Sequence, residues 1–122
     1  MIPEDKVLEY AASLFQSVWA LELLLVFKSD PARAWQADEL IRELRSSQVV
    51  VAEALSNLLA VGLAAKLETG SYQYHANTAE IDEMVTELQR IYHAKPAAVI
   101  REIVTPSNRK LKLLSDAFRF KE

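Results

Sequence analysis

Apolar residues recur at helical spacing along most of the chain, and the first run is the strongest. Within residues 4–28, Leu14, Val18, Leu21 and Leu25 follow one another every three or four positions, and other apolar residues widen this face almost to a full circle. This pattern predicts one long helix, or the same helix in two pieces, that is central in the fold or shared with a second subunit.

A short extended link is expected next. The pair Asp30-Pro31 ends the first helical region, because a proline disfavours helical geometry in the residue before it, and Ala34-Trp35 then forms the link. Asp38 is expected to begin and cap a second helix. The inward residues of that helix are Leu40, Ile41 and Leu44.

A third helix follows after a tight turn at Ser46-Ser47. Ser47 is a good N-terminal cap, and the helix is expected to run to about Val61. Gly62 would end it, because glycine tolerates the left-handed conformation found at helix ends. The inward residues of this helix are Val51, Leu55, Leu58 and Leu59.

A change of period then predicts strands. Residues 63–68 and 72–76 alternate with a period of two, as half-buried strands do, and residues 69–71 form the tip of a hairpin. Pro96 is expected to open a fifth helix, and Pro106-Ser107 to separate it from a sixth. Apolar positions mark the fourth helix at Ile81, Met84, Val85, Leu88, Ile91 and Tyr92, and the sixth at Leu111, Leu114, Ala117 and Phe118. Residues 1–122 are therefore expected to form one domain, mainly α with a small β-hairpin.

About residues 17–77 resemble the winged helix-turn-helix superfamily of the bacterial MarR-type and ArsR-type regulators. The resemblance lies in the order of elements, which is helix, link, helix, turn, helix and hairpin. Leu55, Leu58, Gly62 and Leu63 match the pattern at the end of the recognition helix and the start of the wing. The resemblance implies a cytoplasmic transcriptional regulator that binds double-stranded DNA as a homodimer. Residues 78–122 would supply C-terminal helices for dimerisation or for docking a partner.

On this hypothesis the third helix and its surroundings supply the DNA contacts. Gln48 and Asn57 are candidates for reading adenine, and Val49 for meeting a thymine methyl group. Ser47 and Ser56 would touch phosphates, and the remaining candidates on the outward side are Ala52 and Glu53, with Arg42, Arg45 and Lys66 as phosphate contacts. Each of these residues has the alternative of being a helix cap or ordinary solvated surface.

The distribution of charge argues for a second hypothesis. The chain has 14 basic and 17 acidic residues, which gives a formal net charge of -3. Between Ser46 and Ala65 the one charged residue is Glu53, although phosphate neutralisation by lysine and arginine supplies most non-specific affinity for DNA. The alternative is a winged-helix interaction module that has lost DNA binding and holds another protein through Val49, Val50 and Ala52, or through its basic end.

That basic end lies in residues 101–122, which carry six basic and three acidic residues. The basic residues that could form a C-terminal surface are Arg109, Lys110, Lys112, Arg119 and Lys121. They could contact the DNA backbone, dock on an acidic partner, or form a solvated helix face.

Little in the sequence favours catalysis, a metal site or a membrane span. The chain has no cysteine, and His75 and His93 are not in a metal-ligand spacing. Two glycines are too few for a phosphate-binding loop. Glu9, Gln16 and Glu22 interrupt the first apolar run, which disfavours a membrane span. Three aromatic residues could line a small-molecule pocket or fill the core, and we expect the second for Trp19, Trp35 and Tyr92. We therefore expect no enzyme activity, no cofactor and no metal.

Overall fold

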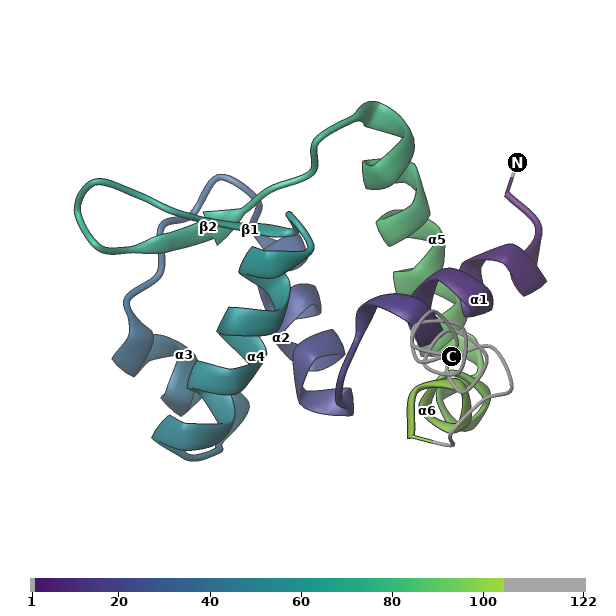
Figure 1. The fold of residues 1–122 in the computed structure, drawn as a ribbon, viewed down its shortest axis with the longest axis horizontal. Coiled ribbons are helices and arrows are strands. Elements are labelled where there is room, and N and C mark those ends of the chain that lie inside the picture. The colour runs from purple at the N-terminus through teal and green to yellow at the C-terminus, as the bar shows by residue number, and fades with distance from the viewer. Residues whose placement is uncertain (1, 105–122) are drawn as a thin grey trace, which may run out of the picture.

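The structure is a computed structural model that describes residues 2–104. This part of the chain is mainly helical, with one two-stranded antiparallel sheet (Figure 1). The elements are α1 (Glu4–Leu14), α2 (Val18–Ser29), α3 (Ala37–Leu44), α4 (Gln48–Ala60), β1 (Ala64–Lys66), β2 (Tyr72–Tyr74), α5 (Ala79–Ala94) and α6 (Pro96–Val104). Their order confirms the expected mainly α chain with a small hairpin. The sixth expected helix and the five residues of the basic C-terminal surface lie outside the described residues.

The first apolar run forms two helices rather than one, and α1 and α2 meet at an angle of 112°. Ser17 is the N-terminal cap residue of α2. Its hydroxyl oxygen accepts a hydrogen bond from the backbone N–H of Ala20 at 3.3 Å, so the second helix begins directly after it. The second helix is the central one, as expected. Its fully buried residues are Ala20, Leu21, Leu23, Leu24 and Phe27.

Figure 1 shows α2 in the middle of the molecule, with α3, α4 and the hairpin on one side and α1, α5 and α6 on the other. One hydrophobic core joins the two sides, because α2 packs against α4 and also contacts α3, β2 and α6. Trp35 belongs to this core as expected, with 4% of its surface exposed. Trp19 does not, since it is 40% exposed. That expectation was wrong because Trp19 lies in the first turn of α2, at the edge of the core.

The hairpin is shorter than the alternating pattern predicts. Ala64 pairs with Tyr74 and Lys66 with Tyr72, so each strand has three residues instead of five or six. Gly62 ends α4 at a positive φ of 79°, as expected, and Gly70 lies at the hairpin tip, where its φ is also positive at 87°.

The link before α3 pairs with the hairpin at one position, where Trp35 forms an isolated antiparallel bridge with Tyr72 of β2. Trp35 and Tyr72 exchange two backbone hydrogen bonds of 2.7 and 2.8 Å. The expected cap of α3 was wrong, because Gln36 and not Asp38 is the N-terminal cap residue. The carboxylate of Glu39 helps to cap the N-terminus of α3, because it accepts a hydrogen bond from the Gln36 backbone N–H at 2.8 Å. Asp38 lies in the first turn of α3, where its charge suits the positive end of the helix dipole.

In the described part of the chain, no single helix is both long enough and apolar enough to cross a membrane. The α1–α2 pair meets that length and composition only when both helices are counted across their 112° bend.

Candidate functional site

The turn between α3 and α4 is built by backbone geometry and one serine. Arg45 adopts the left-handed conformation, with φ 52° and ψ 45°, and its N–H and that of Ser46 bond to carbonyls in the last turn of α3. Two residues later, the Ser47 hydroxyl oxygen accepts a hydrogen bond from the Val50 backbone N–H at 3.2 Å. The expected N-terminal cap of α4 is therefore confirmed.

One side of α4 is exposed to solvent. Its residues, which we call the outer face of α4, are Gln48, Val49, Ala52, Glu53 and Ser56. Val49 is 66% exposed, more than the other large hydrophobic residues that are exposed in residues 2–104. Glu53 carries the one charge on α4. The outer face is thus small, weakly polar and without a cation.

Asn57 does not belong to the outer face, so the expectation that it reads adenine was wrong. It is 4% exposed. Its Oδ1 accepts a hydrogen bond from the Gln16 backbone N–H at 2.8 Å, and its Nδ2 donates one to the Leu14 carbonyl at 2.9 Å. The Leu14 carbonyl is at the C-terminus of α1, and the Gln16 N–H lies in the break between α1 and α2. The primary amide satisfies them both, which an apolar side chain cannot do.

The sequence does contain a signal for this role. Asn57 lies on a line of helical spacing with Val50, Ala54 and Val61, all of which are apolar. An amide on an apolar line of a helix is buried when it finds partners there. The partner groups come from residues more than 40 positions away in the sequence, so they could not be identified in advance.

Three of the predicted phosphate contacts form no salt bridge within residues 2–104. Arg42, Arg45 and Lys66 are exposed, and Lys66 lies over the ring of Tyr72 at 6.0 Å from the ring centre. By contrast, four other cations of the described chain are paired with carboxylates. These pairs are Lys28–Asp82, Arg33–Glu39, Arg90–Glu87 and Lys95–Glu4. Within the described residues, the three cations around α4 are thus exposed and form no ion pair, and Arg42 interacts with the carboxylate of Glu39 only at longer range.

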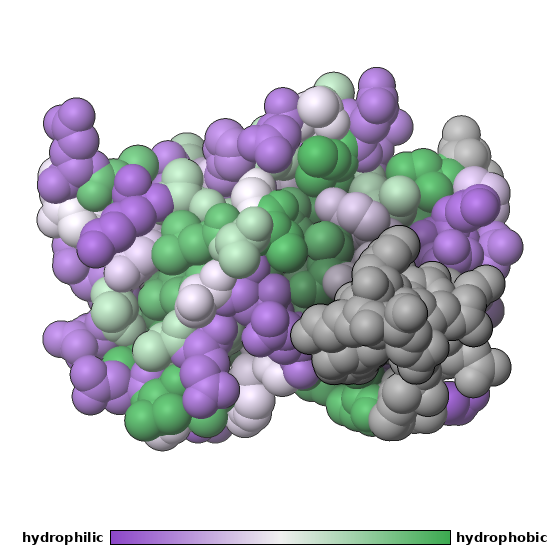
Figure 2. Space-filling view, viewed as in Figure 1, coloured by the Kyte–Doolittle hydropathy of each residue, from purple (hydrophilic) through white to green (hydrophobic). Residues whose placement is uncertain are grey.

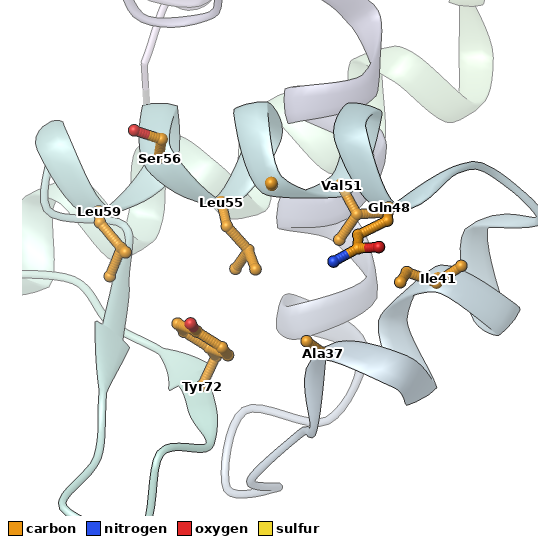
Figure 3. Close-up of a pocket in the computed structure, with 9 residues that line it drawn as sticks. Ala37, Ile41, Gln48, Val51, Leu55, Ser56, Leu59 and Tyr72 are labelled. Atoms are coloured by element: carbon orange, nitrogen blue, oxygen red, sulfur yellow. The ribbon is translucent and has the colours of Figure 1, made fainter.

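Beside the outer face lies an apolar groove of about 260 Å³. Figure 3 shows Leu55 and Leu59 directed from α4 toward the ring of Tyr72, while Ser56 points away. The groove is lined by α3, α4 and β2 through Ala37, Ile41, Gln48, Val51, Ala52, Leu55, Ser56, Leu59 and Tyr72. The sequence did not reveal the groove, because it depends on how three separate elements pack.

Apolar residues extend over this side of the protein. Figure 2 shows them over the C-terminal part of α4 and the start of the hairpin, with a second group where α3 and α4 meet. Leu59, at the end of α4, is 38% exposed. The surface around α4 is therefore mainly apolar, with few charged groups on the helix itself.

Polar side chains tie the hairpin to α2 and α5. The Lys28 Nζ and the Tyr74 hydroxyl both donate hydrogen bonds of 2.7 Å to Oδ1 of Asp82. The hydrogen bond from Lys28, followed by that from Tyr74, holds the pKa of Asp82 below its ordinary value. Burial, with the carboxylate of Asp82 beside it, raises the pKa of Tyr74.

A second polar contact links the same two helices. The Tyr92 hydroxyl in α5 donates a hydrogen bond to the carboxylate of Glu22 in α2. Burial, together with this carboxylate, raises the pKa of Tyr92 to about 12, so the phenol stays protonated at neutral pH. Tyr92 is thus only partly buried and has a polar role in addition to the expected apolar one.

His75 and His93 lie on the surface, and His75 contacts the Asn77 side-chain oxygen at 2.8 Å. Within residues 2–104, no group of three or more histidine, cysteine, aspartate or glutamate side chains is arranged to hold a metal ion.

In comparisons with known proteins, no protein-family model, no curated protein and no solved structure matches this chain.

Proposed function

We propose that this chain has a winged helix-turn-helix fold and is a transcriptional regulator that binds double-stranded DNA as a homodimer. The observation that carries this proposal is the exposed outer face of α4 with three exposed cations around it, Arg42, Arg45 and Lys66, which form no salt bridge within residues 2–104. An exposed helix fits the major groove, and exposed cations at its sides fit phosphates.

Each part of this surface has a role in the proposed complex. The outer face of α4 enters the major groove, while Arg42 and Arg45 reach the backbone from the α3–α4 turn. Lys66 in β1 reaches the backbone beside the hairpin, which acts as the wing. Ser47 accepts a hydrogen bond from the Val50 N–H, and its own hydroxyl proton remains to donate to a phosphate oxygen.

The homodimer is proposed to form through helices outside α2–β2. Winged-helix regulators commonly dimerise in this way, and α1, α5 and α6 pack together on the side of α2 that faces away from α4. A two-fold axis on that side would leave both copies of α4 free to contact DNA. In a cell, such a regulator would work in the cytoplasm, where bacterial DNA lies.

The test is the salt dependence of binding to a random-sequence duplex, followed by fluorescence anisotropy. Each phosphate contact contributes about 0.9 to the slope of log affinity against log salt concentration. We expect Arg42→Ala, Arg45→Ala and Lys66→Ala each to lower that slope. Lys6→Ala is the matched control, because this cation is exposed and forms no salt bridge within residues 2–104 but lies on α1, away from α4.

Two results would contradict the proposal. One is the absence of binding even at low salt. The other is an equal loss of slope in the α4-side variants and in Lys6→Ala, which would mean that the cations act only through net charge.

The second candidate function is a winged-helix module that binds another protein. The apolar groove and the 66% exposure of Val49 favour it, because an exposed apolar surface is common where a protein partner docks. The salt titration separates the two functions, since this module would show no affinity for DNA at physiological salt.

A further inference from the structure

The outer face of α4 is unusual in the chemistry that it offers to a ligand. Val49 and Ala52 are three positions apart, so their side chains are neighbours on the helix surface. Neither is needed for packing, because both are exposed. The first two turns of α4 therefore present methyl groups and lack the arginine or lysine that most often contacts guanine.

Valine at position 49 has no explanation in the folding of the monomer. Of the three consecutive valines, Val51 is buried, Val50 is half-buried, and Val49 is 66% exposed. A β-branched residue also has a lower helix propensity than most polar residues that suit an exposed helical position. An apolar contact with a ligand would explain why a valine occupies this exposed position.

The proposed ligand offers one kind of apolar group in its major groove. That group is the C5-methyl of thymine, and the other base edges there present hydrogen-bond donors and acceptors. We infer that α4 recognises thymine, with the side chains of Val49 and Ala52 packed against thymine methyl groups. This inference rests on the proposed function and specifies the base that the outer face reads.

Neighbouring residues restrict the alternatives. Gln48 lines the edge of the groove near Ile41, and Glu53 is the one charge on α4. A carboxylate repels phosphates and can accept hydrogen bonds only from the amino group of cytosine or adenine, so Glu53 has no favourable contact with thymine itself. Direct contact with thymine therefore falls to the two apolar side chains.

The test compares two duplexes that differ only in the methyl group. The full-length protein is titrated with alternating adenine–thymine and alternating adenine–uracil DNA at one low salt concentration. We expect the uracil duplex to bind about fourfold more weakly for each methyl group contacted, the factor that corresponds to burying one carbon. Val49→Ser removes both methyl groups of the side chain and should reduce this ratio.

A matched control comes from another element. Val104, at the end of α6, is 58% exposed, so Val104→Ser makes the same chemical change away from α4 and should leave the ratio unchanged. Uracil also changes the stiffness of the duplex, but this effect is the same for every protein variant. A difference in ratio between Val49→Ser and Val104→Ser therefore does not come from duplex stiffness.

Each outcome is decisive. A thymine-to-uracil ratio near one in the wild type overturns the inference and leaves DNA binding in place. A ratio that persists in Val49→Ser also overturns it, because the discrimination then comes from DNA shape or from another residue. The absence of salt-dependent binding to either duplex overturns the proposed function, and this inference with it.

Discussion

Asn57 joins segments that are far apart in the sequence, and its removal should be costly. Its amide bonds to the Leu14 carbonyl and the Gln16 N–H, and the residue is 4% exposed. In Asn57→Ala both backbone groups lose their partner, so we expect a loss of about 2–3 kcal/mol in the free energy of unfolding. Urea denaturation followed by circular dichroism measures this change.

The adjacent residue provides the control. Ser56 is exposed on the outer face of α4, so Ser56→Ala should change the free energy of unfolding by less than about 0.5 kcal/mol. Equal stability of the two variants would show that the break between α1 and α2 does not depend on Asn57.

At the residue scale, the sequence predicts a side chain's role best when its partner is close along the chain. Ser47 and Gly62 act within one helical turn of their own position, and both were predicted correctly. Asn57 and Trp19 were placed wrongly, because their environments are set by α1 and by the edge of the core. Periodicity identifies one face of a helix, but it does not specify what covers the flanks of that face.

Ser47 combines two roles that can be separated by substitution. In Ser47→Ala the N-terminal cap of α4 is lost, which should destabilise the protein by about 1 kcal/mol. In Ser47→Asp the carboxylate restores the cap and suits the helix dipole, but it repels phosphate. We expect Ser47→Asp to unfold near the wild-type urea concentration and to bind DNA more weakly than Ser47→Ala. The reverse order of DNA affinities would exclude the N-terminus of α4 from the interface.

The contact between the hairpin and α5 should depend on pH through Asp82. Folding lowers the pKa of this carboxyl, because Lys28 and Tyr74 donate hydrogen bonds to its ionised form. A group of this kind stabilises the folded state above its unfolded pKa, and the contribution is lost as pH falls through the folded pKa. We therefore expect wild-type stability to decline in the acid range more than that of Asp82→Asn. At neutral pH this variant should be less stable by at most about 1 kcal/mol, because the carboxylate is partly exposed.

Hydrogen exchange locates this effect. Asp82→Asn should speed the exchange of backbone amides in β1 and β2, since Tyr74 belongs to β2. Glu87→Gln is the control, because Glu87 pairs with Arg90 of the same helix. Faster hairpin exchange in both variants would show that the charge of α5 matters in general, and not the contact of Asp82.

At the element scale, the sequence predicted which segments are helices and strands but not how they meet. The positions of Asp30-Pro31, Gly62 and Pro96 specify where chain direction changes, because each residue acts on its own backbone or on that of its neighbour. The 112° bend between α1 and α2 and the apolar groove depend on packing between elements. The candidate site could therefore be assigned to α4 in advance, but its apolar edge with Tyr72 could not.

The whole molecule is acidic, and its charge is distributed unevenly. Residues 2–104 contain nine basic and fifteen acidic residues, whereas residues 105–122 contain five basic and two acidic ones. Long-range repulsion from the described part should slow any approach to DNA, and the basic C-terminal residues reduce that repulsion. Replacement of Arg109, Lys110, Lys112, Arg119 and Lys121 by glutamine changes the formal net charge from -3 to -8. We expect the association rate with DNA at low salt to fall, as measured by stopped-flow anisotropy.

The mechanism of that decrease can be determined by restoring charge elsewhere. Glu80 and Glu83 are exposed on α5, and Glu80→Gln with Glu83→Gln adds two positive units to the fivefold variant without touching α4. If the C-terminal residues act through the overall field, this addition should recover part of the association rate. The slope of log affinity against log salt should then change little, because the number of phosphates neutralised stays the same. A slope that falls by several units and is not recovered would instead place the C-terminal residues in direct contact with the DNA backbone.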